Sequence, residues 1–172
     1  YLASSGQAPG PVMAIEYQSL GALLTRAERF EDAASAYDRS INLLREHGGE
    51  EELARVLGEL GKSLDRATEY ESALDTFGAA LEKYEALRQP DFVALQHKRM
   101  GAIYLKRLNN APRAEQHFRQ AQTLYEAAGK DAEAVECTVD IGLCRRRLGD
   151  FAEALTLFQQ ALAAAERDDL LS

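Results

Sequence analysis

The sequence predicts an all-α protein built from repeated pairs of antiparallel helices, and three observations lead to this prediction. Apolar residues recur every three or four positions, as they do in amphipathic helices. A pattern of small and aromatic residues returns four times along the chain. No segment alternates as a half-buried strand would. We therefore expect an α-solenoid, a right-handed superhelical stack of four helical hairpins.

One glycine and one alanine in each unit define the repeat. The glycines are spaced by 40, 40 and 41 residues, and the alanines by 40, 41 and 40. One extra residue therefore lies between Gly101 and Ala114, and we expect it in the turn over 108–112. The repeated positions are Gly21, Gly61, Gly101 and Gly142, with Ala33, Ala73, Ala114 and Ala154.

The first two hairpins are predicted over 11–48 and 51–88. Pro11 suits the first turn of a helix, where a missing N–H costs little, and Gly48 with Gly49 marks the end of the first hairpin. Apolar spacing places the helices near 11–27, 31–46, 51–67 and 71–87.

The last two hairpins are predicted over 91–128 and 132–168. Pro90 and Pro112 suit the first turns of the two helices in the third hairpin, which ends near Gly129. Gly149 and Asp150 separate the helices of the fourth hairpin. The helices are expected near 91–107, 112–127, 132–147 and 152–167, and the whole chain, 1–172, is expected to form a single domain.

The repeated glycines indicate close packing. Glycine inside a helix costs about 1 kcal/mol relative to alanine, so four glycines at one position indicate a partner helix too close for a Cβ atom. The repeated alanines are interpreted in the same way. Four rings are expected to fill the wider space between neighbouring hairpins: Tyr37, Phe77, Phe118 and Phe158.

Together these positions resemble the tetratricopeptide repeat (TPR) family over about residues 11 to 167. The slots are Tyr17-Leu20-Gly21-Leu24-Phe30-Ala33-Tyr37-Ser40, Leu57-Leu60-Gly61-Leu64-Tyr70-Ala73-Phe77-Ala80, Met100-Gly101-Tyr104-Ala114-Phe118-Ala121 and Ile141-Gly142-Gly149-Phe151-Ala154-Phe158-Ala161. The usual repeat has 34 residues. The longer period is similar to that of kinesin light chains, Pins/LGN polarity adaptors and many bacterial regulators.

The resemblance implies a protein-interaction scaffold whose first helices line a concave groove for a peptide or helix of a partner. Its groove positions lie 6, 3 and 2 residues before and 1, 4 and 5 residues after the repeated glycine. The predicted partner-binding residues are Arg55, Lys62, Arg66, Lys98, Arg99, Lys106 and Arg146. The apolar floor is expected from Ala22, Leu95, Ala102, Leu105 and Leu143.

Basic residues outnumber acidic ones at these positions, which favours an acidic peptide or a carboxylate terminus as the partner. The alternative is that the basic side chains only solvate helix faces and pair with Glu59, Asp65, Glu136 and Asp140, and both interpretations stay open. Chaperone-binding members of the family clamp a terminal carboxylate with lysine and asparagine. The position after each repeated glycine holds no asparagine here, so neither that partner nor those of the Pins/LGN class are carried over.

The sequence offers no residues in catalytic, cofactor-binding or metal-binding roles, and we predict that the protein is not an enzyme. His47, His97 and His117 are scattered without metal-ligand spacing. Cys137 and Cys144 lie seven residues apart in one helix, about 10 Å by helical rise, which is too far for a disulfide. They are interpreted as small core residues in a protein of the reducing cytoplasm.

The formal net charge of -8 argues against a surface offered as a whole to nucleic acid or anionic membrane. No apolar run approaches the roughly 20 residues that span a bilayer. A second hypothesis is a regulatory or self-association domain of a larger protein, such as a bacterial signalling regulator, because no clearly polar helix caps the repeats. The chain starts with Tyr1, so residues 1–10 are expected to be the tail of an earlier repeat, and Ser172 falls where another first helix would begin.

Overall fold

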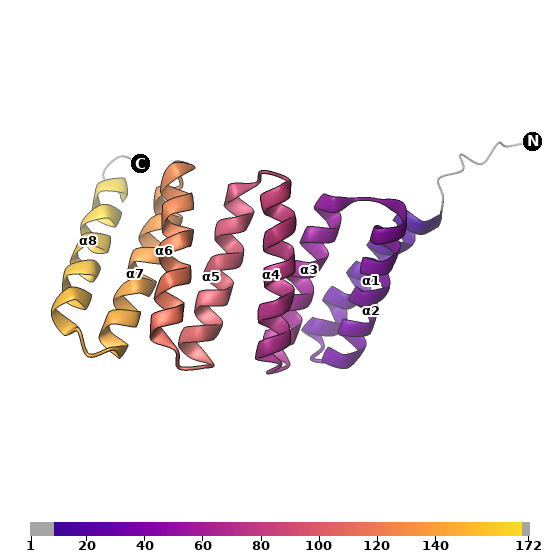
Figure 1. Cartoon of the computed structure of the whole chain (residues 1–172), viewed down its shortest axis with the longest axis horizontal. Coiled ribbons are helices and arrows are strands. Elements are labelled where there is room, and N and C mark those ends of the chain that lie inside the picture. The colour runs from indigo at the N-terminus through magenta and orange to yellow at the C-terminus, as the bar shows by residue number, and fades with distance from the viewer. Residues whose placement is uncertain (1–8, 170–172) are drawn as a thin grey trace, which may run out of the picture. The chain divides into compact units, whose positions relative to one another are not determined.

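The computed structural model describes residues 9–169, and all of their regular structure is helical, as predicted. The helices begin and end within two residues of the expected positions. They are α1 (Pro9–Arg26), α2 (Phe30–His47), α3 (Glu50–Arg66), α4 (Tyr70–Ala86), α5 (Pro90–Lys106), α6 (Ala111–Ala127), α7 (Asp131–Arg147) and α8 (Phe151–Asp169). Within each of the two compact units described below, consecutive helices run antiparallel and are joined by short loops (Figure 1).

The chain divides into two compact units, 1–83 and 84–172, and the division falls within α4. The first unit contains α1, α2, α3 and most of α4, and the second contains α5 to α8. The handedness of the stack and the single domain stay predictions. Tyr1 to Ala3 and Ser172 lie outside the described residues. No helix within 9–169 is long and apolar enough to cross a membrane.

Each repeated glycine of a first helix lies against the ring on the second helix of its own hairpin. A Cβ atom added at Gly61 would lie 2.6 Å from Cε1 of Phe77, and the other three glycines show the same contact at 2.7 to 2.8 Å. The close approach predicted from the glycines is confirmed. The rings were predicted to lie between neighbouring hairpins, and each also lies against its own first helix, which that prediction did not include. Phe118 shares one apolar cluster with Ile141 and Cys144 of the next hairpin. The other pairs are Gly21 with Tyr37, Gly101 with Phe118, and Gly142 with Phe158.

The loop inside each hairpin turns through one residue with a positive φ angle. Thr68 and Gly149 hold this position with φ of 67° and 84°, and Asn109 holds it with 50°. The loop between α5 and α6 has four residues, 107–110, where the other three hairpins have three. The extra residue of the third repeat therefore lies in the predicted turn.

Candidate functional site

In the second unit, α5 and α7 lie side by side and present one continuous face, which we call the first-helix face. Lys98 of α5 forms an ion pair with Glu136 of α7, and Leu105 of α5 packs in one apolar cluster with Ile141 and Cys144 of α7. The early turns of both helices thus lie together at one end of the face, and their last turns lie together at the other.

A cavity of about 350 Å³ opens at the early end of the first-helix face. Phe92 lies in its wall with 44% of its surface exposed and stacks on Tyr84, with ring centroids 4.9 Å apart. Leu95 follows one turn later on α5. The remaining wall comprises Tyr125 and five charged residues, Asp91, Lys98, Lys130, Glu133 and Glu136.

The charges around this cavity are largely paired. Lys130 lies 2.8 Å from Asp91 and 4.0 Å from Glu133, while Lys98 pairs with Glu136. The wall contains three carboxylates and two ammonium groups, so this end of the face has no positive excess. An exposed aromatic ring flanked by such pairs suits an apolar side chain of a ligand better than an acidic one.

Three of the predicted binding residues, Arg55, Lys62 and Arg66, lie on α3 of the first unit. Arg55 pairs with Glu52 and donates a 2.7 Å hydrogen bond to Gln18 of α1. Lys62 lies 2.5 Å from Glu59.

Arg66 donates a 2.9 Å hydrogen bond to the carbonyl of Thr25, and its guanidinium lies over the ring of Phe30. These three side chains therefore bind neighbouring helices or pair with acidic residues of α3 itself. This agrees with the alternative interpretation, in which the basic side chains pair within the fold and do not bind a partner.

The other four predicted binding residues lie on α5 and α7, and two of them are free. Lys98 is paired, and Arg99 donates a 3.2 Å hydrogen bond to Gln96. Lys106 and Arg146 are exposed in the last turns of their helices and form no ion pair within the described part of the chain. The only predicted cations that remain available to a partner thus lie at the late end of the first-helix face.

The predicted apolar floor needs one correction. Leu105 is buried in the cluster that joins α5 to α7 and is not exposed on the face. Thr25 holds the equivalent position of α1 and is also buried, with a 3.0 Å hydrogen bond to Ser63 of α3. The position four residues after the repeated glycine points toward the next first helix, and on α7 it holds the exposed Arg146, which therefore lies at the edge of the face away from α5. Leu95, Ala102 and Leu143 are half-buried, and Val139, which the floor prediction omitted, is exposed.

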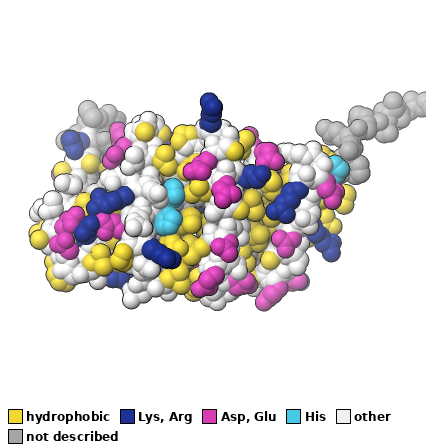
Figure 2. All heavy atoms as spheres, viewed as in Figure 1, with side chains coloured by type: hydrophobic (Ala, Val, Ile, Leu, Met, Phe, Trp, Pro, Cys, Tyr) yellow, Lys and Arg dark blue, Asp and Glu magenta, His cyan; other side chains and the backbone are white. Residues whose placement is uncertain are grey.

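The prediction that the histidines are scattered is wrong for two of them. Nδ1 of His97 on α5 lies 3.1 Å from Nδ1 of His117 on α6, and Tyr104 stacks on His117. Figure 2 shows two adjacent histidine side chains beside a hydrophobic patch. Burial and the neighbouring imidazole lower the pKa of His97 to about 4, and burial with Arg113 lowers the pKa of His117. His97 and His117 are 20 residues apart, half of the repeat period, which places one on each helix of a hairpin. This spacing is the sequence signal that could have indicated the contact.

A larger cavity, of about 910 Å³, lies on the other side of α5, where sequence analysis expected no site. Val93 and His97 line it from α5, and Arg119 and Leu124 line it from α6. Arg119 forms an ion pair with Glu115 and lies 3.9 Å from Glu153, so its charge is balanced by carboxylates of the second unit.

Neither cysteine is suited to nucleophilic chemistry. Cys137 and Cys144 are free and buried, as the sequence predicted, and burial raises the pKa of each thiol to about 12. Within 9–169, no group of three or more His, Cys, Asp or Glu side chains could hold a metal ion. That the protein has no catalytic activity and no cofactor stays a prediction.

Comparison with known proteins gives a family and a fold. The family model for "Soluble NSF attachment protein, SNAP" matches residues 16–171. An alpha-soluble NSF attachment protein of Vitis vinifera is 26% identical over 149 residues, which cover 80% of this chain and 52% of the relative. The chain thus spans about half the length of this curated relative.

Two solved structures share the fold. BtubC (BKLC) from P. vanneervenii superposes with a TM-score of 0.83 at 20% identity, covering 97% of this chain and 68% of that one. The TPR domain of Arabidopsis FLU superposes with a TM-score of 0.63 at 23% identity, covering 69% of this chain and 99% of that one. The predicted TPR-like family and the all-α solenoid class are confirmed.

Proposed function

Because the chain belongs to the soluble NSF attachment protein family and has a TPR-like repeat fold, we propose that it is a protein-interaction scaffold. The binding site in this proposal is the first-helix face of the second unit. Its occupant is a peptide or helix of a partner protein. The curated relative is itself named as an NSF attachment protein, which supports the general class and does not identify the partner of this chain.

The observation that carries the proposal is the polarity of this face along its length. An exposed ring, Phe92, stands with Leu95 at the early end, and the unpaired cations Lys106 and Arg146 stand at the late end. From Leu95 to Lys106 is eleven residues of helix, or about 16 Å at 1.5 Å per residue. A face with an apolar anchor point among paired charges at one end and unpaired cations at the other selects for direction as well as composition.

The same geometry describes the chemistry of the occupant. An extended chain covers about 3.3 Å per residue, so about five residues separate an apolar anchor at Leu95 from an acidic group near Lys106. The acidic partner expected from the sequence is thus proposed for one half of the face only. At the early end the paired carboxylates of the cavity disfavour an acidic side chain.

A display library of random 12-residue peptides, selected on the whole chain, tests the proposal. We expect enriched peptides that carry an aromatic or aliphatic residue about five positions from an aspartate, a glutamate or the terminal carboxylate. Charge reversal with Lys106→Glu and Arg146→Glu should weaken the binding of such a peptide at least tenfold. Arg45→Glu makes the same charge change as each of the two single reversals, on an exposed residue of α2, and serves as the matched control for Lys106→Glu and Arg146→Glu tested one at a time.

The apolar end has its own test. Phe92→Asp should abolish binding of the selected peptide, whereas Phe151→Asp, which changes an exposed ring on α8, should not. Full binding by both Phe92→Asp and the double charge reversal would refute the first-helix face as the site. Lys62, Arg66 and Lys98 are unsuitable targets, because reversing their charge would also break contacts within the fold.

A second candidate function is self-association as a regulatory domain. Large apolar side chains are exposed on α1 and on α8, the first and the last of the described helices. Repeat proteins must cover such end faces, with a polar capping helix or with another molecule.

A further inference from the structure

The outer faces of the first and last helices carry apolar side chains at regular helical spacing. On α8, Leu155 and Leu162 are 58% and 60% exposed and lie on the same stripe as the exposed Phe151. On α1, Leu20 is 45% exposed. Apolar stripes of this kind on a soluble protein mark surfaces that another molecule covers.

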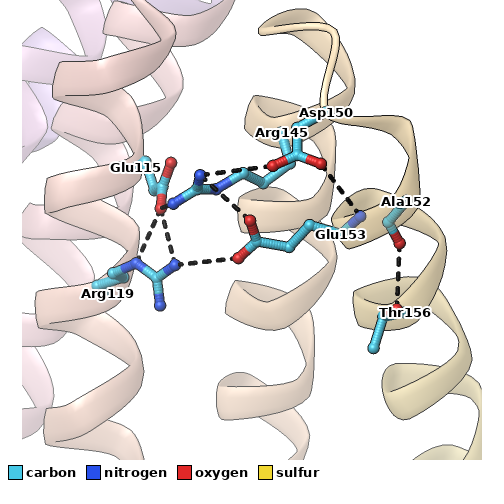
Figure 3. Close-up of polar contacts among 7 residues, drawn as sticks. All are labelled: Glu115, Arg119, Arg145, Asp150, Ala152, Glu153 and Thr156. Carbon is cyan, nitrogen blue, oxygen red and sulfur yellow. Dashed lines mark hydrogen bonds and ion pairs between the residues drawn. The ribbon is translucent and has the colours of Figure 1, made fainter.

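The inner junction of the second unit shows how one hairpin is covered by its neighbour. Glu115 of α6 is only 7% exposed and accepts hydrogen bonds from Arg119 on its own helix and from Arg145 of α7 (Figure 3). Glu153 of α8 lies 3.2 Å from Arg145 and 3.9 Å from Arg119. The second helix of one hairpin thus places two side chains between the two helices of the next.

The repeat pattern shows which residues of α8 are equivalent to the residues of α6 in this junction. Leu155 stands one residue after its repeated alanine, which is the position of Glu115 in α6. Leu162 stands eight residues after that alanine, which is the position of Gln122, and Gln122 donates a 3.0 Å hydrogen bond to Thr138 of α7. At both positions, the polar residue that α6 uses to contact α7 is a leucine on α8.

The outer face of the first hairpin shows the matching replacements. Leu24 stands three residues after the repeated glycine, which is the position of Arg145 in α7, and Tyr17 holds the position of Thr138. At both positions a polar residue of α7 is replaced by a largely apolar one on α1. If the outer face of α8 packed on the outer face of α1 in the same register, apolar residues would therefore meet where polar residues of α6 and α7 meet in the inner junction.

The first hairpin also has an open cavity where the junction would form. It measures about 310 Å³, and Tyr17, Leu20 and Leu24 of α1 provide its apolar wall. Arg29 and Asp32 line it at the positions that Asp150 and Glu153 hold in the fourth hairpin. In the second unit the equivalent place receives Glu115 and Arg119 (Figure 3).

We propose that a second copy of this chain fills the cavity, with its α8 lying on the α1–α2 hairpin and repeating the register by which α6 lies on α7 and α8. This inference rests on the self-association proposed above and adds the two faces and their register. Leu155 of one copy then meets Leu24 of the other, and Leu162 meets Tyr17. Gln159, at the position of Arg119, comes within reach of Asp32.

The contact is heterologous, because the two copies use different faces. One free face remains at each end of such a dimer, so the association continues head to tail until it closes or stops. A symmetric contact of α8 with α8 would instead end at the dimer. The two arrangements respond differently to variants that block one face at a time.

Sedimentation velocity on the whole chain, from about 5 to 500 µM, tests the proposal. Leu155→Glu blocks the face of α8, and Leu20→Glu blocks the face of α1; both side chains are exposed, so the fold should remain, as far-UV circular dichroism can verify. We expect the wild type to associate with rising concentration and each variant alone to stay monomeric. An equimolar mixture should form a heterodimer of twice 19.0 kDa that grows no further.

Two other results would overturn the proposal. One would exclude self-association altogether, and the other would exclude only the head-to-tail contact. A wild type that remains monomeric at the highest concentration removes self-association together with this inference. A wild type that associates while the mixed variants stay apart, or a Leu20→Glu variant that still dimerises, removes the head-to-tail contact alone. Peptide binding to the first-helix face, measured on Leu155→Glu, is independent of either result.

Discussion

Replacing Gly61 with alanine tests whether the ring of Phe77 sets the distance between the helices of the second hairpin. The new Cβ atom would lie 2.6 Å from Cε1 of the ring, whereas carbon atoms in contact are normally about 3.5 to 4.0 Å apart. The ring must therefore move by about 1 Å in a tightly packed core, where overpacking costs about 1 to 3 kcal/mol.

Gly78 provides a matched control one residue after the ring. A Cβ atom at Gly78 would meet nothing within 4 Å, so Gly78→Ala should keep the gain of about 0.5 to 1 kcal/mol that alanine brings to a helix. Because this gain is common to both variants, the difference between Gly61→Ala and Gly78→Ala isolates the overpacking cost. We expect Gly61→Ala to be less stable than the control by about 1 to 3 kcal/mol.

Urea unfolding followed by far-UV circular dichroism measures both free energies. A third variant identifies the ring as the cause: Phe77→Leu should cost less stability in the Gly61→Ala background than in the wild type, because leucine leaves room for the new methyl group. Equal stability of Gly61→Ala and Gly78→Ala would refute the account of the repeated glycine.

Three further predictions concern the histidine pair, a loop and the inner junction. With a folded pKa of about 4 against 6.5 unfolded, His97 takes up its proton mainly in the unfolded state, so stability should fall as the pH drops from 6.5 to 4. His97→Gln should remove about 2 kcal/mol of that loss in urea titrations at both pH values, and an unchanged pH dependence would contradict this. Thr68→Gly should raise the free energy of unfolding by about 1 kcal/mol, because it relieves a β-branched residue at φ 67°, and Gly149→Thr should lower it by a similar amount; opposite signs in urea unfolding would contradict this. Glu115→Leu should cost about 1 to 3 kcal/mol in urea unfolding, because it removes the partner of the α7 arginine, and an unchanged midpoint would show that this junction contributes little.

The periodic part of the fold was predictable from the sequence because it depends on spacing. Small residues at 40-residue intervals fixed the helices to within two residues, and the one irregular interval located the longer loop before α6. The close approach at Gly61 followed from the improbability of four glycines at one helical position. Its contact partner did not, because spacing does not indicate which way Phe77 points around its helix.

The candidate site was predictable only in part, and the reason is again rotation. Successive residues of a helix are about 100° apart around its axis. A family pattern can therefore give the correct height of a residue along the helix and still assign a buried residue such as Leu105 to the surface. Charge pairing was the other unknown. Lys98 and Lys106 look alike in the sequence, yet Lys98 forms an ion pair with Glu136, whereas Lys106 forms none with the described residues and only lies near enough to Asp140 for its charge to favour the ionised carboxylate. The neighbouring helix determines this difference.

Methyl NMR of the whole chain, labelled at leucine and valine and titrated with a selected peptide, tests the proposed function most directly. We predict shifts of the Leu95, Val139 and Leu143 signals, which lie on the first-helix face, with Val93 unchanged in the larger cavity on the other side of α5. Shifts confined to Val93, or to the leucines of α8, would contradict the proposal that partners bind on the face formed by α5 and α7.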